Sequence, residues 1–411
     1  MNYYDVIDLG TYGDLYNSDV NGINEASVTV GRAPATEGAS YSHAFRRDPQ
    51  GNIVDLTPSH SKGSSASSVN DANPDQVVGA TGLEATLWSD GGTIDLHAML
   101  GNPASSFATD VNDSGMVTGW ARVQNQSSEH AFLLDTVTSQ AVTDLMLPGD
   151  FGGLSSHGHA INNAGLVVGD SAGPGGSRAF YYDGAMHALP TFGSFTSARD
   201  VSDGGHIVGY SALAPQGNGH TPIHAFLYTS EIGMVDLHVY GGGDATSKAL
   251  AVNTHGDVVG YGIHDTWSAF LFSGGQMVDL NDRIDPGAQY ILREARDIND
   301  AGQIVCLAGY SSWPDYEDRL VLLEPLAQTP PWALPKPGRI GAVAVDPLSL
   351  VLSGSLYAKL TLPRPAPVED IREQVRRAVA DLDEAQRRQI LARARALGHL
   401  AREIEQVLGK G

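Results

Sequence analysis

Short apolar runs separated by Asn, Asp and Gly recur along the chain. The clearest example covers residues 155–169 and reads SSHGHAINNAGLVVG, with one apolar run ending at Ile161 and another at 167–168. The residues between them, 163–165, are Asn-Ala-Gly, which suit a turn because Asn and Gly adopt positive φ at low cost. Two β-prone runs around such a turn predict a tight antiparallel hairpin.

This hairpin motif occurs seven times in the sequence. The other copies are VNGINEASVTVG at 20–31, SSVNDANPDQVVG at 67–79, DVNDSGMVTG at 110–119, DVSDGGHIVG at 200–209, AVNTHGDVVG at 251–260 and DINDAGQIVC at 297–306. A fixed motif at roughly regular spacing indicates a repeat architecture rather than a set of unrelated strands.

Two further motifs alternate with the hairpin motif in a constant order. A His-Ala-Phe-like motif occupies 43–45, 85–88, 130–132, 178–180, 224–226 and 268–270, with a degenerate copy at 319–322. An Asp-Leu motif occupies 8–9, 55–56, 95–96, 144–145, 236–237 and 279–280, with Ala188-Leu189 as a variant. Each unit therefore holds four short strands in about 40 to 50 residues, which is typical of a β-propeller blade.

The order of the motifs also predicts how the ring closes. The chain begins with an Asp-Leu strand at 4–9, before the first hairpin, and the last unit ends at 320–323 without one. The first strand can therefore complete the last blade, and this removes two sheet edges that would otherwise be exposed. The sequence predicts an all-β, seven-bladed propeller sealed by a strand from the N-terminus.

These motifs resemble those of the bacterial HAF-repeat family, whose members are described as probable extracellular repeat proteins. The resemblance is carried by His-Ala-Phe-Leu, by Asp-Leu-Gly-Thr at 8–11 and by the Ile-Asn-x-x-Gly-x-Val-Val-Gly hairpin motif, and it covers residues 1–326. It implies a propeller-type repeat. Because the family is defined by its repeat, the resemblance implies no activity and no cofactor.

Charge divides the chain into two parts. Residues 1–326 contain 12 Lys and Arg against 38 Asp and Glu, whereas residues 327–411 contain 13 against 9. An acidic propeller repels nucleic acid and anionic lipid, so neither is expected as its partner. The remaining partner classes are a protein or a small-molecule ligand.

Cysteine content and the N-terminus bear on the compartment. The single cysteine, Cys306, excludes an intrachain disulfide framework. The start, Met-Asn-Tyr-Tyr-Asp-Val, has neither a basic nor an apolar leader region, so a cytoplasmic location is expected, in contrast to the family description. No membrane span is expected, since the most apolar stretch, 340–362, contains Asp346, Pro347 and Lys359.

The region after residue 326 has a different character. Residues 327–338, AQTPPWALPKPG, predict a Pro-rich linker, and residues 339–411 form a separate C-terminal segment. Within it, 340–362 is compatible with either strand or helix. Apolar residues at helical spacing then predict a helical pair over 368–408. This pair either packs within its own chain or mediates a homodimer or the docking of a partner.

Several long insertions follow the Val-Val-Gly strand of their unit, at 32–42, 120–129, 210–223 and 307–318. In a propeller these loops share one face, here called the loop face, which is the usual ligand side. Aromatic residues are expected there, either lining a site or simply covering the blades; they are Tyr12, Tyr16, Trp120, Phe151, Phe192, Phe195, Tyr210, Tyr240, Tyr261, Trp267, Trp313 and Tyr316.

Motifs with a known chemistry are incomplete in this chain. Residues 169–173 match Gly-x-Ser-x-Gly, but the motif ends a strand and no helix follows. Residues 110–115 and 297–302 resemble the start of a calcium loop and lack its later ligands. No metal site and no cofactor are predicted from them.

The histidines fall into two groups. His43, His130 and His224 belong to the repeated motif and are expected to be structural, with hydrogen bonds between blades. Four others lie outside the repeat and are expected on the loop face: His157, His159, His220 and His264. A metal held by His157, His159 and a third ligand is the alternative for that pair.

The innermost strands of a propeller line its central channel. Three residues before the Asn of each hairpin motif, or before its equivalent Ser202, stand Asn21, Ser67, Thr109, His159, Arg199, Leu250 and Arg296. The residues that follow them are Gly22, Ser68, Asp110, Ala160, Asp200, Ala251 and Asp297. Arg199 and Arg296 are therefore expected near the channel, either in ion pairs with Asp200, Asp297 or another acid, or in a pocket for an anionic or carboxylate-bearing ligand.

Two classes of function remain. The first is a non-enzymatic binding or scaffold propeller with a site on the loop face near the channel. Its expected ligand-binding residues are Arg199, Arg296, His159, His157, Tyr210 and Lys248. The alternative is a lyase, hydrolase or cyclase with its active site at the channel mouth, using His157, His159, Arg199, Tyr210 or Arg296 as acid, base or anion clamp.

Overall fold

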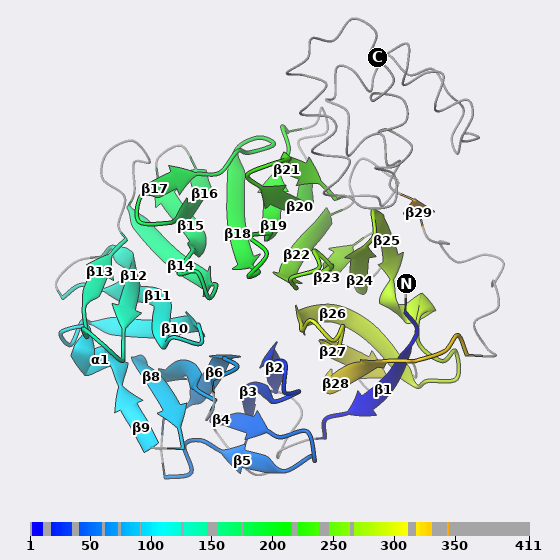
Figure 1. Cartoon of the computed structure of the whole chain (residues 1–411), viewed down its shortest axis with the longest axis horizontal. Coiled ribbons are helices and arrows are strands. Elements are labelled where there is room, and N and C mark those ends of the chain that lie inside the picture. Colours follow the sequence, from blue (N-terminus) through cyan, green and yellow to red (C-terminus); the bar gives the residue numbers. More distant parts are fainter. Residues whose placement is uncertain are drawn as a thin grey trace, which may run out of the picture.

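The computed structural model describes most of the first 330 residues and one short strand beyond them. The described ranges are 2–10, 18–34, 41–59, 62–72, 75–90, 92–124, 127–145, 154–173, 176–215, 221–237, 246–263, 267–310, 318–330 and 343–344. Seven sheets are arranged as blades around a central channel (Figure 1).

Blades one to three are built from consecutive strands. Blade one contains β2 (Asp19–Ile23), β3 (Thr29–Pro34), β4 (Ser42–Arg47) and β5 (Ile53–Asp55). Blade two contains β6 (Ser64–Val69), β7 (Val77–Thr81), β8 (Glu84–Ser89) and β9 (Gly92–Asp95), followed by the short helix α1 (Leu96–Met99). Blade three contains β10 (Ser105–Val111), β11 (Met116–Arg122), β12 (Glu129–Asp135) and β13 (Val142–Asp144).

Blades four to six follow the same order. Blade four contains β14 (Ser155–Ile161), β15 (Val167–Gly173), β16 (Gly176–Tyr182) and β17 (Met186–Ala188). Blade five contains β18 (Phe195–Val201), β19 (Ile207–Ala212), β20 (Ile223–Thr229) and β21 (Gly233–Asp236). Blade six contains β22 (Thr246–Val252), β23 (Val258–Ile263), β24 (Trp267–Ser273) and β25 (Gln276–Asp279), followed by the 3-10 turn η2 (Leu280–Asp282).

Blade seven combines the two ends of the repeat region. It contains β26 (Tyr290–Ile298), β27 (Ile304–Tyr310) and β28 (Asp318–Pro325), with β1 (Tyr4–Asp8) as its outer strand. β1 pairs antiparallel with β28, from Tyr4 opposite Pro325 to Asp8 opposite Val321. The prediction of an all-β, seven-bladed propeller is confirmed.

The C-terminal segment contributes one described element. β29 (Val343–Ala344) pairs with β25 and is the fifth strand of blade six, so strand is the conformation at this point of the 340–362 stretch. The remainder of that stretch, most of the predicted linker and the predicted helical pair at 368–408 lie outside the described residues. Among the described residues, no helix has the length and apolar character needed to cross a membrane.

The core lies between neighbouring blades, where the repeated motifs place their apolar residues. Phe180, Phe226 and Phe270 of the His-Ala-Phe-like motif are fully buried. Phe270 of blade six shares a buried cluster with Val208 and Leu227 of blade five. Burial of each such side chain contributes about 1.5–3 kcal/mol to stability. Because the motif recurs in each unit, this stabilising contact between blades recurs as well.

The Asn of the hairpin motif joins each blade to the next. Asn112 accepts hydrogen bonds from the N–H groups of Ser114 and Met116 in its own turn, and its Nδ2 donates to the carbonyl of Asn162 in blade four. Equivalent interblade bonds are donated by Asn24, Asn70, Asn162, Asn253 and Asn299. In the calcium-like loop at 110–115, Asp110 and Asp113 likewise accept hydrogen bonds from Ile161 and Asn163 of blade four.

The His residues of the His-Ala-Phe-like motif are structural, but they bond within a blade rather than between blades. The Nδ1 atoms of His43, His130 and His224 lie 2.8, 2.9 and 2.8 Å from carboxylate oxygens of the Asp-Leu motif. Those carboxylates belong to Asp55, Asp144 and Asp236, on the adjacent fourth strand of the same blade. For these Nδ1 atoms the expected bonds between blades are replaced by bonds within a blade, because strands three and four of one unit are neighbours in one sheet.

Candidate functional site

Every innermost strand carries a β-bulge at the same place in the repeat. In blade five, Ala198 pairs with Gly209 and Asp200 with Val208, so Arg199 has no partner on β19. The same interruption leaves Asn21, Ser67, Thr109, His159, Leu250 and Arg296 unpaired in the other blades. A bulge re-aims the side chain of the extra residue, and here it turns seven side chains toward the channel.

The Gly that ends the hairpin motif is the residue that makes the bulge possible. At Gly119 and Gly169, a Cβ atom would overlap the carbonyl oxygen of Phe107 or His157 on the bulged strand. Gly, which has no Cβ atom, readily permits such a close approach of two backbones. In blade seven Cys306 takes the place of this Gly, and β26 carries a second irregularity between Leu292 and Glu294.

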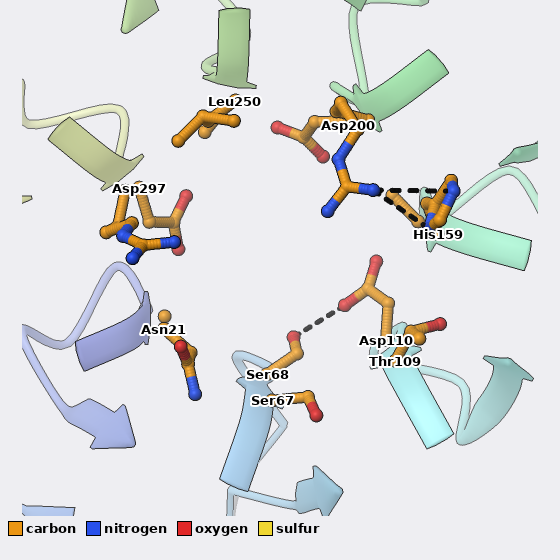
Figure 2. Close-up of a pocket in the computed structure, with 14 residues that line it drawn as sticks. Asn21, Ser67, Ser68, Thr109, Asp110, His159, Asp200, Leu250 and Asp297 are labelled. Atoms are coloured by element: carbon orange, nitrogen blue, oxygen red, sulfur yellow. Dashed lines mark hydrogen bonds between the residues drawn. The ribbon is translucent and has the colours of Figure 1, made fainter. Parts of the chain in front are cut away.

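The bulged residues and the residues that follow them enclose a cavity of about 320 Å³ in the channel (Figure 2). Its lining consists of Asn21, Gly22, Ser67, Ser68, Thr109, Asp110, His159, Ala160, Arg199, Asp200, Leu250, Ala251, Arg296 and Asp297. These are the two consecutive positions of each innermost strand that were named from the alignment of the hairpin motifs. Three of the six expected ligand-binding residues, Arg199, Arg296 and His159, line the cavity.

The two arginines of the cavity differ in their partners. Arg296 lies 3.1 Å from a carboxylate oxygen of Glu294 and 3.5 Å from one of Asp19. The Arg199 guanidinium instead lies 3.4 Å from both ring nitrogens of His159, and within the described ranges it has no carboxylate at ion-pair distance. The ion-pair alternative therefore holds for Arg296, whose partners are the 'another acid' of that expectation rather than Asp200 or Asp297, and among the described residues it does not hold for Arg199.

His159 is held as a neutral imidazole beside Arg199. Burial and the nearby guanidinium of Arg199 lower the pKa of His159, and its Nε2 lies 3.3 Å from Asp170 Oδ2. Asp170 is fixed in turn by the hydroxyl of Ser197, which donates to the same oxygen at 2.6 Å. Although burial alone would raise it, these bonds hold the pKa of Asp170 below its usual range.

His157 lies outside the cavity but belongs to the same polar network. Its Nε2 is 2.8 Å from Glu129 Oε2, and its Nδ1 is 4.0 Å from Asp170 Oδ1. Arg122 completes the series by donating to Glu129 at 2.8 Å. A continuous row of polar and ionisable groups thus leads from Arg122 and Glu129 of blade three to His159 of blade four. Glu129 and Asp170 were not foreseen in it.

Tyr210 and Lys248 also lie outside the cavity, nearer the loop face. Lys248 precedes the bulged residue Leu250 by two positions, and Tyr210 pairs with Ser197, which precedes Arg199 by two. Lys248 is paired with Tyr261 across the strands of blade six, and its Nζ lies 4.6 Å from the ring centre of Tyr210 and 5.8 Å from that of Tyr261. Trp267 stacks on Tyr261 with ring centres 4.9 Å apart. These residues form a cation–π cluster at the channel mouth.

Three partly buried carboxylates face the cavity from blades three, five and seven. Figure 2 shows the side chains of Asp110, Asp200 and Asp297 directed toward the open centre of the channel. Burial raises the pKa of Asp110 to about 7 and that of Asp200 to about 6. Burial, together with the neighbouring carboxylates Asp200 and Asp110, raises the pKa of Asp297 well above its ordinary value.

Each of these carboxylates also links two blades. Asp200 accepts from the N–H groups of Val201 in its own strand and Val252 in blade six. Asp110 bonds in the same way to Val111 and Ile161, and Asp297 to Ile298 and Ile23. In the sequence these acids occur in alternate blades. Asp200 and Asp297 were expected to act only as partners of the arginines.

The opposite end of the channel is lined by the hairpin turns. A second cavity of about 200 Å³ lies there, and Ser68 and Asp110 line both cavities. Five acidic residues of the turns line it as well: Glu25, Asp71, Asp113, Asp203 and Asp300. Side chains of all five accept the backbone N–H of a turn in a neighbouring blade.

Other expected sites have simple outcomes. No group of three or more His, Cys, Asp or Glu residues in the described ranges is close enough to hold a metal ion. Ser171 of the Gly-x-Ser-x-Gly match is buried inside β15, and its hydroxyl donates to the carbonyl of Ser155. Several residues expected on the loop face lie outside the described residues, namely Tyr12, Tyr16, Phe151, His220, Tyr240, His264, Trp313 and Tyr316.

Comparison with known proteins yields one family match over part of the chain. Residues 100–188 match a family model described as "Protein of unknown function (DUF3466)". No curated protein matches the chain. The matched residues span blade three and blade four and carry no description of activity.

Several solved structures match the chain at low identity. TolB from Acinetobacter baumannii matches with a TM-score of 0.35 and 11% identity, over 79% of this chain and 55% of that one. The propeller domain of the Trilobed protease from Pyrococcus furiosus matches with a TM-score of 0.46 and 9% identity, over 74% and 93%. The acylaminoacyl peptidase of Pyrococcus horikoshii matches with a TM-score of 0.46 and 12% identity, over 77% and 52%.

The chain thus spans about half the length of the TolB and acylaminoacyl peptidase chains it matches. At these identities and TM-scores the matches transfer no residue role. The chemistry of the site must therefore be argued from its own side chains.

Proposed function

We propose that this propeller is a non-enzymatic binding protein that holds a small carboxylate-bearing ligand in its central channel, entered from the loop face. The observation that carries this proposal is Arg199, whose guanidinium lines a cavity of about 320 Å³ without a carboxylate partner in the described part of the chain. A guanidinium recognises a carboxylate through two parallel hydrogen bonds, and it keeps its charge at all physiological pH values.

The surroundings of Arg199 support this role. His159 is neutral, so it fixes the guanidinium from one side without neutralising it. Lys248 contributes a further positive charge at the mouth, where a ligand would enter. Aromatic residues beside Lys248 give the entrance an apolar wall, as is usual for small-molecule sites.

Thermal stability with and without small carboxylates tests the proposal. Acetate, pyruvate, succinate and other small acids are screened against the unmodified protein. We expect the acid that fits the site to raise the melting temperature, since ligand binding stabilises the folded state by mass action. Arg199→Ala should leave folding nearly intact and abolish the rise, and Arg199→Lys should weaken it. The matched control is Arg296→Ala, which should lower the melting temperature without ligand because it leaves Glu294 and Asp19 without this partner.

Two results would contradict a carboxylate site. One is that no acid stabilises the unmodified protein at millimolar concentration. The other is that Arg199→Ala binds the best acid as well as the unmodified protein does.

One observation favours the enzymatic alternative, a lyase, hydrolase or cyclase. His159 is uncharged, lies against Asp170 and faces the same cavity as Arg199, which is the arrangement of a general base beside an anion clamp. A ligand found by the screen should then be converted on incubation, as followed by NMR. His159→Gln should retain binding and lose conversion if this alternative holds.

Other features of the chain enter the proposal as well. We propose that the five-residue pairing of β1 with β28 is what closes the ring, and that the repeats belong to the HAF type. The proposed organisation is a propeller over 1–326, a linker over 327–338 and a C-terminal segment over 339–411. Its helical pair at 368–408 would serve association or intrachain packing.

A further inference from the structure

The cavity is lined by two levels of opposite charge. The bulged residues form the level nearer the loop face, which includes Arg199 and Arg296. The following residues form the level nearer the hairpin turns, which includes Asp110, Asp200 and Asp297. Consecutive strand residues are about 3.3 Å apart along the strand, so the two levels are separated by a distance of that order.

The charges of the lining do not suit a simple anion. Three carboxylates face two guanidiniums, and one of those guanidiniums, Arg296, is already paired with Glu294 and Asp19. A ligand bearing only a carboxylate would satisfy Arg199 and leave the three carboxylates of the deeper level uncompensated. Partly buried carboxylates are costly to ionise without a compensating charge, because burial removes them from water, and a cation bound beside them would offset that cost.

The deeper carboxylates also have unused hydrogen-bonding capacity. An ionised carboxylate has about four acceptor positions. Asp200 accepts two backbone N–H groups and Asp297 accepts two, whereas Asp110 accepts two and the hydroxyl of Ser68. The described part of the chain supplies no further donor to Asp200 or Asp297, although both face the cavity.

The spacing of these carboxylates favours a molecule over a metal ion. They belong to three alternate blades around the axis, and among the described residues they do not come together as a metal-binding group. A primary ammonium carries three N–H donors and one positive charge, which matches acceptors distributed around a channel.

We infer that the ligand is a small zwitterion, a free α-amino acid, whose carboxylate binds Arg199 and whose ammonium faces Asp200 and Asp297. This inference rests on the proposed carboxylate site and adds the second half of the ligand. The short distance between the ammonium and carboxylate of an α-amino acid is of the order of the separation between the two levels. Leu250, between blades five and seven, supplies the apolar part of the wall.

Matched ligands test the inference. Binding of the common L-amino acids is measured by thermal shift and calorimetry, and each amino acid that binds is compared with its deaminated acid and its decarboxylated amine. The amino acid should bind about 10- to 100-fold more tightly than the deaminated acid, as expected for the loss of a charge-assisted hydrogen bond.

Three variants localise the effect. Asp200→Asn should reduce amino acid affinity about tenfold or more and change the affinity for the deaminated acid less than about twofold. Asp297→Asn is the second test, in case Asp200→Asn does not fold. Asp113→Asn removes the same charge from the turn end of the channel and is the matched control, with affinity unchanged for both ligands.

The outcomes separate the inference from the proposed function. If deaminated acids bind as well as amino acids, or if Asp200→Asn and Asp297→Asn both bind amino acids normally, the zwitterion inference is overturned and the carboxylate site stands. If decarboxylated amines bind as tightly as amino acids, or if neither amino acids nor acids bind, both proposals fall.

Discussion

The hairpin turns and the bulges lie a few residues apart on the same strands, yet they use the repeat in opposite ways. At the turns, six of the seven blades place an Asn that bonds its own turn and the next blade, with Ser202 as the exception. At the bulges, the seven blades place Asn, Ser, Thr, His, Arg, Leu and Arg. Within one molecule, positions that repeat serve the framework, and positions that vary provide the chemistry of the channel.

Arg199 and Arg296 show the same contrast at a finer level. Both are bulged arginines at equivalent positions, but Arg296 meets Glu294 and Asp19 whereas Arg199 meets a neutral imidazole. The repeat determines where a side chain points. The neighbouring residues differ from blade to blade, and they determine whether the charge of that side chain is already paired within the protein.

The largest expected effect comes from removing part of the framework. Deleting residues 1–10 removes β1 and the buried side chains Tyr4 and Leu9, which should cost about 3–6 kcal/mol and leave β28 with an open edge. The measurement is denaturation followed by circular dichroism. Deleting 343–411, which removes only the two-residue strand β29 from the described sheets, is the control and should change stability far less. Equal melting of the 1–10 deletion and the full chain would refute closure by β1.

A single substitution at each position tests the contrast between turns and bulges directly. Asn112→Ala should destabilise by about 2–3 kcal/mol, because it leaves the N–H groups of Ser114 and Met116 and the carbonyl of Asn162 without their buried partner. Thr109→Ala, at the bulge of the same strand, should cost about 1 kcal/mol. Comparable losses in the two variants would argue against a division of roles.

The buried carboxylates should make the protein less stable as pH rises from 6.5 to 8. The folded pKa of Asp110, about 7, is above that of the unfolded chain, so the folded state holds a proton that the unfolded state has released. Ionisation of Asp110 in this range should cost about 1 kcal/mol.

The histidines act in the opposite direction. The pKa values of His159 and, at the turns, of His206 are lowered, so the unfolded chain holds protons on these residues that the folded state has released. Near and just above the ordinary His pKa of about 6.5 they therefore raise stability with pH and offset part of the loss. Arg199 and Arg296, which face the same cavity, remain charged throughout. Chemical denaturation at several pH values measures the slope for the unmodified protein and for Asp110→Asn, and the substitution should remove the part of the loss that this carboxylate causes. Equal slopes for the two proteins would contradict the assignment.

The smallest effect is expected at the channel mouth. Lys248→Gln removes a charge held over Tyr210 and should change stability by less than about 1 kcal/mol. It should weaken carboxylate binding about twofold at low ionic strength and have little effect at high salt, since exposed charges are screened. A large loss of affinity that persists in salt would place Lys248 in direct contact with the ligand.

The fold and the place of the site were readable from the sequence because both follow the period of the repeat. Aligning the seven hairpin motifs was enough to identify all fourteen residues that line the cavity. The partners of those residues were not readable in this way. Asp19, which meets Arg296, belongs to blade one, and its approach depends on the curvature of the whole ring.

Two signals in the sequence could have been used further. His43, His130 and His224 occur only in units whose Asp-Leu motif keeps its Asp, which would have indicated pairs within a blade. The constant Gly of the hairpin motif, at a strand position that has no turn, would have indicated a bulge on the facing strand. The pairing of residues 343–344 with β25 had no such signal, since it involves two residues far from the repeat.

The bulges have a consequence for how the channel can change. Each of the seven bulged residues is an insertion that takes no part in the ladder of its sheet, and each lies opposite a Gly or, in blade seven, Cys306. Mutations at these seven positions therefore alter the lining one residue at a time while the strands keep their register. Such a scaffold can acquire new ligand selectivity without a change of fold, either in evolution or by combinatorial mutagenesis.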